Sequence, residues 1–215
     1  MANVCSGVSA MTVRGVFLYF AISAIVAGIL ILLEGVCTVG TGASQTGSVG
    51  AAEWAGRLLS IDVVMPIGLI LLAVGAFCLA YVYNANLCYL SGALLITDAV
   101  ISWILHFASP TSTLGIRASA IVSGSILLIT MVVMGITLRR ISPALKVPAL
   151  ATGGYVLILL FGILGGIGSL LLVSWPNTSI FRAGTVLGGV GWILGGIAGI
   201  LLFVAFLSAF IRGVK

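Results

Sequence analysis

The sequence predicts an all-α integral membrane protein with six transmembrane helices arranged as three consecutive hairpins. Of its 215 residues, 61% are hydrophobic and 6% are charged, whereas about a quarter of the residues in a soluble domain are charged. The mean hydropathy is +1.36. A water-soluble fold could not bury so much apolar surface, so we expect one polytopic membrane domain over 1–215.

Six apolar segments are each long enough to cross a bilayer. A helix rises about 1.5 Å per residue, so a hydrocarbon core of about 30 Å requires about 20 residues. We therefore predict transmembrane helices over 15–37, 63–83, 87–108, 118–138, 148–175 and 183–211. The first apolar run is longer than the roughly 7 to 15 residues of a signal peptide, which indicates an uncleaved helix.

The connection between the first two helices is expected to be a long loop over 38–62. This range is rich in Gly, Ser, Thr and Ala. Trp54 and Arg57 lie on a weakly amphipathic turn within it, a pattern typical of a segment in the membrane interface. The other connections are short, so the sequence predicts no soluble domain.

The distribution of Lys and Arg predicts that both termini are cytoplasmic. Cytoplasmic loops carry an excess of basic residues. With six spans, one side holds six basic residues and the other holds three: Arg14, Arg139, Arg140, Lys146, Arg212 and Lys215 against Arg57, Arg117 and Arg182. The expected localisation is a multi-pass protein of the cell membrane, with the 139–146 loop in the cytoplasm.

Glycines in the last predicted helix indicate a helix-packing face. They follow one another at steps of 4, 3, 4 and 4 residues: Gly184, Gly188, Gly191, Gly195 and Gly199. At about 100° per residue they form one continuous face, and a face without side chains lets another helix approach closely in lipid. The fifth helix offers a matching surface at Gly162, Gly165, Gly166 and Ser169.

Asp98 is the most informative polar residue, because it lies near the predicted bilayer midplane. Inserting an Asp there costs about 2.5 to 3.5 kcal/mol, so the side chain is expected to face a partner or a wet cavity. Ser91, Ser102 and Ser109 share its face, and His106 lies on the flank. Two interpretations are open: a proton or cation site, or a structural hydrogen bond to a neighbouring helix.

Glu34 and His106 are expected within about one turn of the outer ends of their helices. A carboxylate and an imidazole at that depth could form a pH-sensitive pair. The alternative is two interfacial side chains that reach headgroups and water. The candidate intramembrane polar site therefore consists of Asp98, Ser102, His106 and Glu34.

Several classes of function are excluded by composition. One histidine cannot provide a bis-histidine haem, and one membrane-embedded aspartate cannot provide a two-aspartate protease site. The four cysteines lack the spacing of a metal or disulfide motif. The sequence identifies no catalytic, metal-binding or cofactor-binding residue, and its scattered basic residues are not typical of a nucleic-acid binder.

Two functional hypotheses follow. The first is a non-enzymatic, multi-pass subunit that packs against other membrane proteins or against itself, such as an accessory subunit of a respiratory or other membrane complex. Its basis is the abundance of small-residue helix faces. The second is a small transporter or channel in which Asp98 serves as an intramembrane proton or cation site. Either protein has the lipid bilayer as a partner, and neither binds nucleic acid.

Overall fold

A computed structural model describes residues 9–44, 49–83, 85–108, 113–145, 148–174 and 178–212. Within these ranges the chain is helical and contains no strand. The elements are α1 (Ala10–Ser44), α2 (Val49–Tyr83), α3 (Asn86–Ala108), α4 (Thr113–Ile141), α5 (Pro148–Leu171), α6 (Thr178–Arg212) and two short 3-10 turns, η1 (Ser142–Ala144) and η2 (Leu172–Ser174). Six helices are long and apolar enough to cross a membrane, which confirms the helical membrane class.

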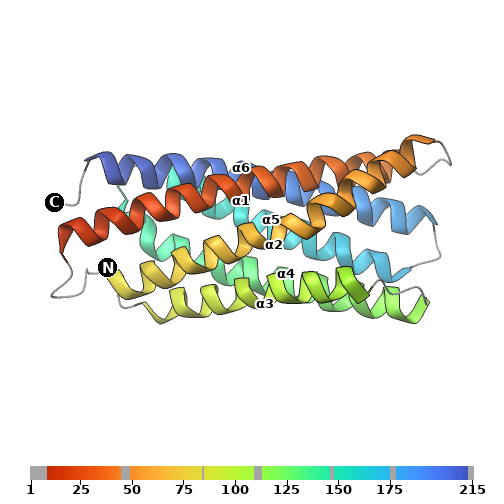
Figure 1. Cartoon of the computed structure of the whole chain (residues 1–215), viewed down its shortest axis with the longest axis horizontal. Coiled ribbons are helices and arrows are strands. Elements are labelled where there is room, and N and C mark those ends of the chain that lie inside the picture. Colours follow the sequence, from red (N-terminus) through yellow and green to blue (C-terminus); the bar gives the residue numbers. More distant parts are fainter. Residues whose placement is uncertain are drawn as a thin grey trace.

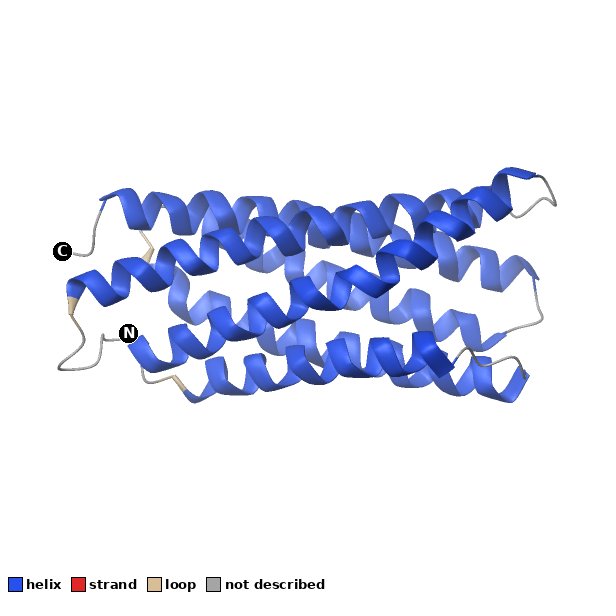
Figure 2. Cartoon of the chain, viewed as in Figure 1, coloured by secondary structure: helices blue, strands red, loops and turns tan. Residues whose placement is uncertain are grey.

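The six helices form a closed ring. Each packs against its neighbour in the sequence, and α6 closes the ring against α1 (Figures 1 and 2). In the described part of the chain, helices on opposite sides of the ring do not approach one another closely. The start of α1 and the end of α6 lie together at what we call the termini end; we call the opposite end the cavity end (Figure 1).

The side chains on the outside of the ring are apolar, whereas the buried side chains include polar ones. On α1, for example, Ile22, Ile29 and Leu33 are 52%, 47% and 47% exposed. Glu34 and Asp98 are instead buried. This pattern is suited to lipid as the surrounding solvent, because a soluble protein of this size rarely exposes so large an apolar surface.

Charged side chains mark the two edges of the apolar belt. Arg117 and Arg139 lie on α4, 22 residues apart, and both are exposed. At 1.5 Å per residue this separation is about 33 Å, close to the thickness of a hydrocarbon core. Arg14 and Arg212 are likewise exposed near the termini end.

The predicted long loop over 38–62 is wrong. Helix α1 continues to Ser44 and α2 begins at Val49. Small residues can remain helical here because α1 packs tightly on α6: a Cβ atom at Gly42 would lie 3.0 Å from the Val186 side chain. The segment with Trp54 and Arg57 is thus the first part of α2, although these two side chains lie outside the described ones.

Apolar side chains fill the middle of the ring and its termini end. The rings of Phe20 and Phe206 are tilted against each other with centroids 4.4 Å apart, and the Phe17 and Phe206 ring centroids are 5.7 Å apart. Closer to the middle, Leu95 and Phe161 are almost completely buried. This apolar plug closes one half of the ring.

Helix α6 packs closely between α1 and α5, and its glycines contact both. A Cβ atom at Gly191 would lie 2.5 Å from the Gly165 backbone nitrogen on α5, and one at Gly199 would lie 2.6 Å from Gly28 Cα on α1. Gly184 faces α5, and Gly195 lies between Phe161 and Ile31. Gly188 has more room, since its nearest neighbour would be 3.8 Å away.

The matching surface predicted on α5 is wrong in part. Gly165 does meet α6, together with Gly168, which was not expected. Gly162 and Gly166 face α4 instead, against Met131 and Leu128, and Ser169 lies 3.1 Å from where a Gly124 Cβ would be. Helix α5 lies between α4 and α6, so some of its small residues contact α4 and others contact α6.

Candidate functional site

A cavity of about 470 Å³ occupies the half of the ring next to the cavity end. All six helices line it. It extends from Asp98 in the middle of α3 to Thr41 in the last turn of α1 and Phe181 in the first turn of α6. Its polar lining comprises the side chains of Glu34, Thr38, Thr41, Asp98, Ser102, His106, Ser119, Ser123, Ser169, Thr185 and Trp192.

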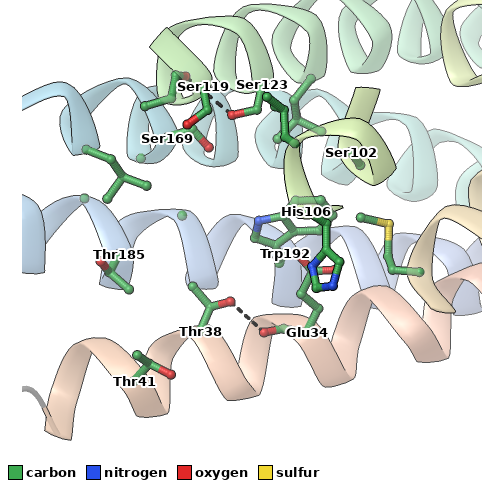
Figure 3. A pocket seen from close by; sticks show the side chains of 18 of the residues that line it. Glu34, Thr38, Thr41, Ser102, His106, Ser119, Ser123, Ser169, Thr185 and Trp192 are labelled. Atoms are coloured by element: carbon green, nitrogen blue, oxygen red, sulfur yellow. Dashed lines mark hydrogen bonds between the residues drawn. The ribbon is translucent and has the colours of Figure 1, made fainter. Parts of the chain in front are cut away.

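The titratable groups that line the cavity come from two helices: Glu34 from α1, and Asp98 and His106 from α3. Figure 3 shows Glu34, His106 and Trp192 directed into the same space from α1, α3 and α6. Helical spacing brings them there. On α3, positions 98, 102 and 106 are four residues apart and therefore share one face.

Asp98 is the deepest of these groups along α3. Its side chain is only 5% exposed, and its Oδ2 atom is buried without a hydrogen-bond partner among the described residues. Leaving a buried polar atom unsatisfied costs about 1 to 3 kcal/mol, and more for a charged group. Asp98 is also one of the residues that line the cavity, so its side chain is the candidate group for binding something that enters the cavity.

The cavity lining also provides hydroxyl groups as acceptors. Thr38 donates its hydroxyl hydrogen to the Glu34 carbonyl at 2.8 Å, and Thr185 donates to the Phe181 carbonyl at 3.0 Å. With their hydrogens used within their own helices, these oxygens retain lone pairs that can accept a bond from a ligand. Ser119, Ser123 and Ser169 lie together on the wall formed by α4 and α5 (Figure 3).

The floor of the cavity is aromatic. The Trp192 ring lines the cavity and packs on Phe161, with ring centroids 4.7 Å apart. Phe161 in turn belongs to the apolar plug, where it lines a small void of about 20 Å³ together with Leu95 and Met131. The Trp192–Phe161 pair therefore marks the boundary between the polar cavity and the apolar plug.

All four residues of the predicted polar site line this cavity: Asp98, Ser102, His106 and Glu34. The expected depth of Glu34 was wrong. It lies ten residues before the end of α1, because this helix continues beyond its apolar segment to Ser44. His106, in contrast, is two residues from the end of α3.

The serine stripe predicted around Asp98 does not extend along the whole helix. Ser91 bonds Thr137 on α4 at 2.7 Å and the Leu87 carbonyl at 2.8 Å, outside the cavity. Ser109 lies outside the described residues. The polar path along α3 therefore ends at Asp98.

Several residues that line the cavity were not predicted from the sequence. Thr38 and Thr41 follow Glu34 at helical spacing, but the expected loop began at Thr38. Ser119 and Ser123 are four residues apart on α4. Trp192 lies within the glycine-rich part of α6, where we considered packing alone. A search for polar and aromatic residues at steps of three and four would have found these positions.

Arg182 and Arg117, at the cavity end, have different surroundings. Arg182 Nε donates a hydrogen bond to the Gly42 carbonyl at 2.9 Å, which ties the start of α6 to the end of α1. Arg117 is exposed on α4, and the Arg57 side chain lies outside the described ones. The Arg182 contact stabilises the rim of the cavity.

No protein-family model matches this sequence, and comparisons with curated proteins and with solved structures find no similar chain. The functional argument therefore depends on the cavity. In the part of the chain that the structure describes, no three His, Cys, Asp or Glu side chains are grouped as a metal ion would require. The geometry is suited to binding a solute.

Proposed function

We propose that this protein is a small membrane transporter whose central cavity binds a cation, with Asp98 as the anionic group. The observation that carries the proposal is the Asp98 side chain, which lines the cavity and whose buried Oδ2 atom has no hydrogen-bond partner among the described residues. An ionisable group is retained in the membrane interior mainly where it binds something or moves charge.

The position of the cavity supports this proposal. It is lined by all six helices and reaches approximately the middle of α3, so a bound solute would contact every helix of the ring. Transporters commonly bind substrates and coupling ions near the bilayer midplane, between helices that move relative to one another.

A route for movement follows from the two halves of the ring. The cavity reaches the cavity end, whereas the apolar plug closes the termini end. Translocation requires the plug to rearrange. Met131 and Met134 line its small void, and methionine side chains adapt easily to such changes. Close glycine contacts leave α6 with few side chains to obstruct sliding along α1 and α5.

The direction of the cavity follows from the basic residues. Because the start of α1 and the end of α6 lie at the termini end, the six-to-three excess of Lys and Arg supports a cytoplasmic location for that end. The cavity then opens toward the outside of the cell. We propose that the structure represents an outward-facing state.

The accessory-subunit hypothesis stays a prediction. Its basis was the glycine-rich faces. In the structure the described glycines of α6 pack against α1 and α5 of the same chain. No specific observation favours a protein partner over lipid at the outer surface, so the transporter is the better-supported function.

Uptake into proteoliposomes tests the proposal. Purified full-length protein is reconstituted, and entry of radiolabelled sodium, rubidium and methylammonium is measured, together with internal pH. We expect uptake of at least one cation, and we expect Asp98→Asn to reduce it by about tenfold or more, since loss of one partner of a buried ion pair costs about 2 to 5 kcal/mol.

Thr97→Val provides the matched control. Thr97 is adjacent to Asp98 but exposed outside the cavity, and its hydroxyl donates to the Ala93 carbonyl at 2.9 Å. This variant should transport as the wild type does. Equal uptake by wild type and Asp98→Asn, or by wild type and protein-free liposomes, would contradict the proposed function.

A further inference from the structure

We infer that the solute is a small organic ammonium ion, recognised by the Asp98 carboxylate and the indole ring of Trp192. This inference depends on the proposed function and specifies its substrate class. It follows from the hydrogen-bonding character of the walls, from the aromatic floor and from the size of the cavity.

Several oxygen atoms of the walls are available to a ligand as acceptors. Asp98 lines the cavity, and its buried Oδ2 atom has no hydrogen-bond partner in the described part of the chain. Thr38 and Thr185 donate to their own helices, so their oxygens face a ligand as acceptors. A ligand that satisfies such walls carries hydrogen-bond donors, and an ammonium group carries up to three.

The floor and sides suit the carbon part of such a ligand. Leu105, Leu127 and Leu172 line the cavity between the polar groups. Trp192 presents its ring there, held from below by Phe161 at 4.7 Å. An indole is the strongest cation–π partner among the side chains, and mostly apolar cavities with a few polar groups are typical of organic ligands.

The grouping of the side chains argues against a bare inorganic ion. In the part of the chain that the structure describes, no three His, Cys, Asp or Glu side chains lie together as a metal ion would require. A dehydrated ion needs several oxygen atoms within about 2 to 2.6 Å. A cavity of about 470 Å³ instead falls in the size range of organic ligand sites.

Equilibrium binding of radiolabelled ethylammonium to the full-length protein in detergent tests the inference. Asp98→Asn should weaken binding by about a hundredfold, and Trp192→Leu by about fivefold. Trp192→Phe keeps an aromatic ring and should retain most of the affinity, which separates loss of recognition from loss of folding. Thr97→Val should bind as the wild type does.

Competition defines the class of the ligand. Unlabelled ethylammonium should displace the label, whereas sodium and rubidium at a hundredfold excess should not. The inference is overturned if ethylammonium does not bind, if Asp98→Asn or Trp192→Leu binds it as tightly as the wild type, or if rubidium or sodium displaces it equally well. If uptake of an inorganic cation depends on Asp98 while ethylammonium fails to bind, the proposed transport stands and only the substrate class is wrong.

Discussion

Asp98 and Ser91 lie on the same side of α3, but they differ in their hydrogen bonding. Ser91 is paired with Thr137 through a buried hydrogen bond of 2.7 Å. The Asp98 Oδ2 atom has no such bond within the described ranges. Removing the Asp98 carboxyl group is therefore expected to raise the stability of the protein, whereas removing the hydrogen bond of Ser91 is expected to lower it.

Replacing Asp98 by leucine should stabilise the protein while abolishing cation uptake. The change removes a buried polar atom whose burial costs about 1 to 3 kcal/mol, and it leaves no described hydrogen-bond partner stranded. The melting temperature of the detergent-solubilised protein, followed by intrinsic fluorescence, should equal or exceed that of the wild type. A clearly lower melting temperature would show that the carboxyl group stabilises the fold.

Thr137→Val should act in the opposite direction. It removes the hydroxyl that bonds Ser91, the Leu87 carbonyl at 3.3 Å and the Val133 carbonyl at 2.8 Å. Interhelical hydrogen bonds in membrane proteins contribute about 0.6 kcal/mol on average and at most about 1.7. The same thermal measurement should show a modest decrease, with uptake retained. Loss of uptake without loss of stability would contradict the assignment of Thr137 to packing.

At the level of elements, α6 depends on the absence of side chains. Gly191 lies directly against the α5 backbone, whereas Gly188, less than one turn away, has space beside it. The two glycines form a matched pair on one helix. A single methyl group therefore distinguishes a tight contact from a loose one.

Gly191→Ala should destabilise the protein, and Gly188→Ala should not. The alanine Cβ at position 191 would lie 2.5 Å from a backbone nitrogen that cannot move independently, and overpacking costs about 1 to 3 kcal/mol. Position 188 gains helix propensity of up to about 1 kcal/mol without a clash. Thermal unfolding of both variants checks this. Equal melting temperatures would mean that α5 and α6 separate more easily than the structure indicates.

The sequence predicted the helices better than their lengths. Hydropathy located six apolar segments, because only the hydrocarbon-spanning part of a helix must be apolar. It could not show that α1 continues through Thr38 and Thr41 to Ser44, because the packing of these small and polar residues on α6 is a tertiary effect. The same limit affected Gly162 and Gly166, whose partner helix cannot be read from spacing alone.

At the scale of the whole molecule, the ring explains why the candidate site was only partly predictable. Asp98 could be identified by its depth alone, since acids are costly there. Thr185 and Trp192 become site residues only because α6 closes against α1 and brings them opposite α3. Which helices face one another is a property of the assembled ring.

Membrane orientation gives a prediction for the complete chain. With the start of α1 and the end of α6 on the same side, reporter fusions at both termini should give the same location, and the excess of basic residues predicts that this location is the cytoplasm. In a cysteine-free background, Ser179→Cys near the start of α6 should react with an impermeant thiol reagent from outside the cell. Reaction from the cytoplasmic side only would reverse the proposed direction of the cavity.

The closure of the ring by its first and last helices has a consequence for biogenesis. Helix α1 is synthesised before α6, yet α6 is the helix that covers Gly28 and Gly35. Until then, the α1 surface that carries these glycines must be held by lipid or by the insertion machinery. A product truncated before residue 178 would contain five helices but no enclosed cavity. The cavity is therefore enclosed only after α6 has been synthesised and has packed against α1.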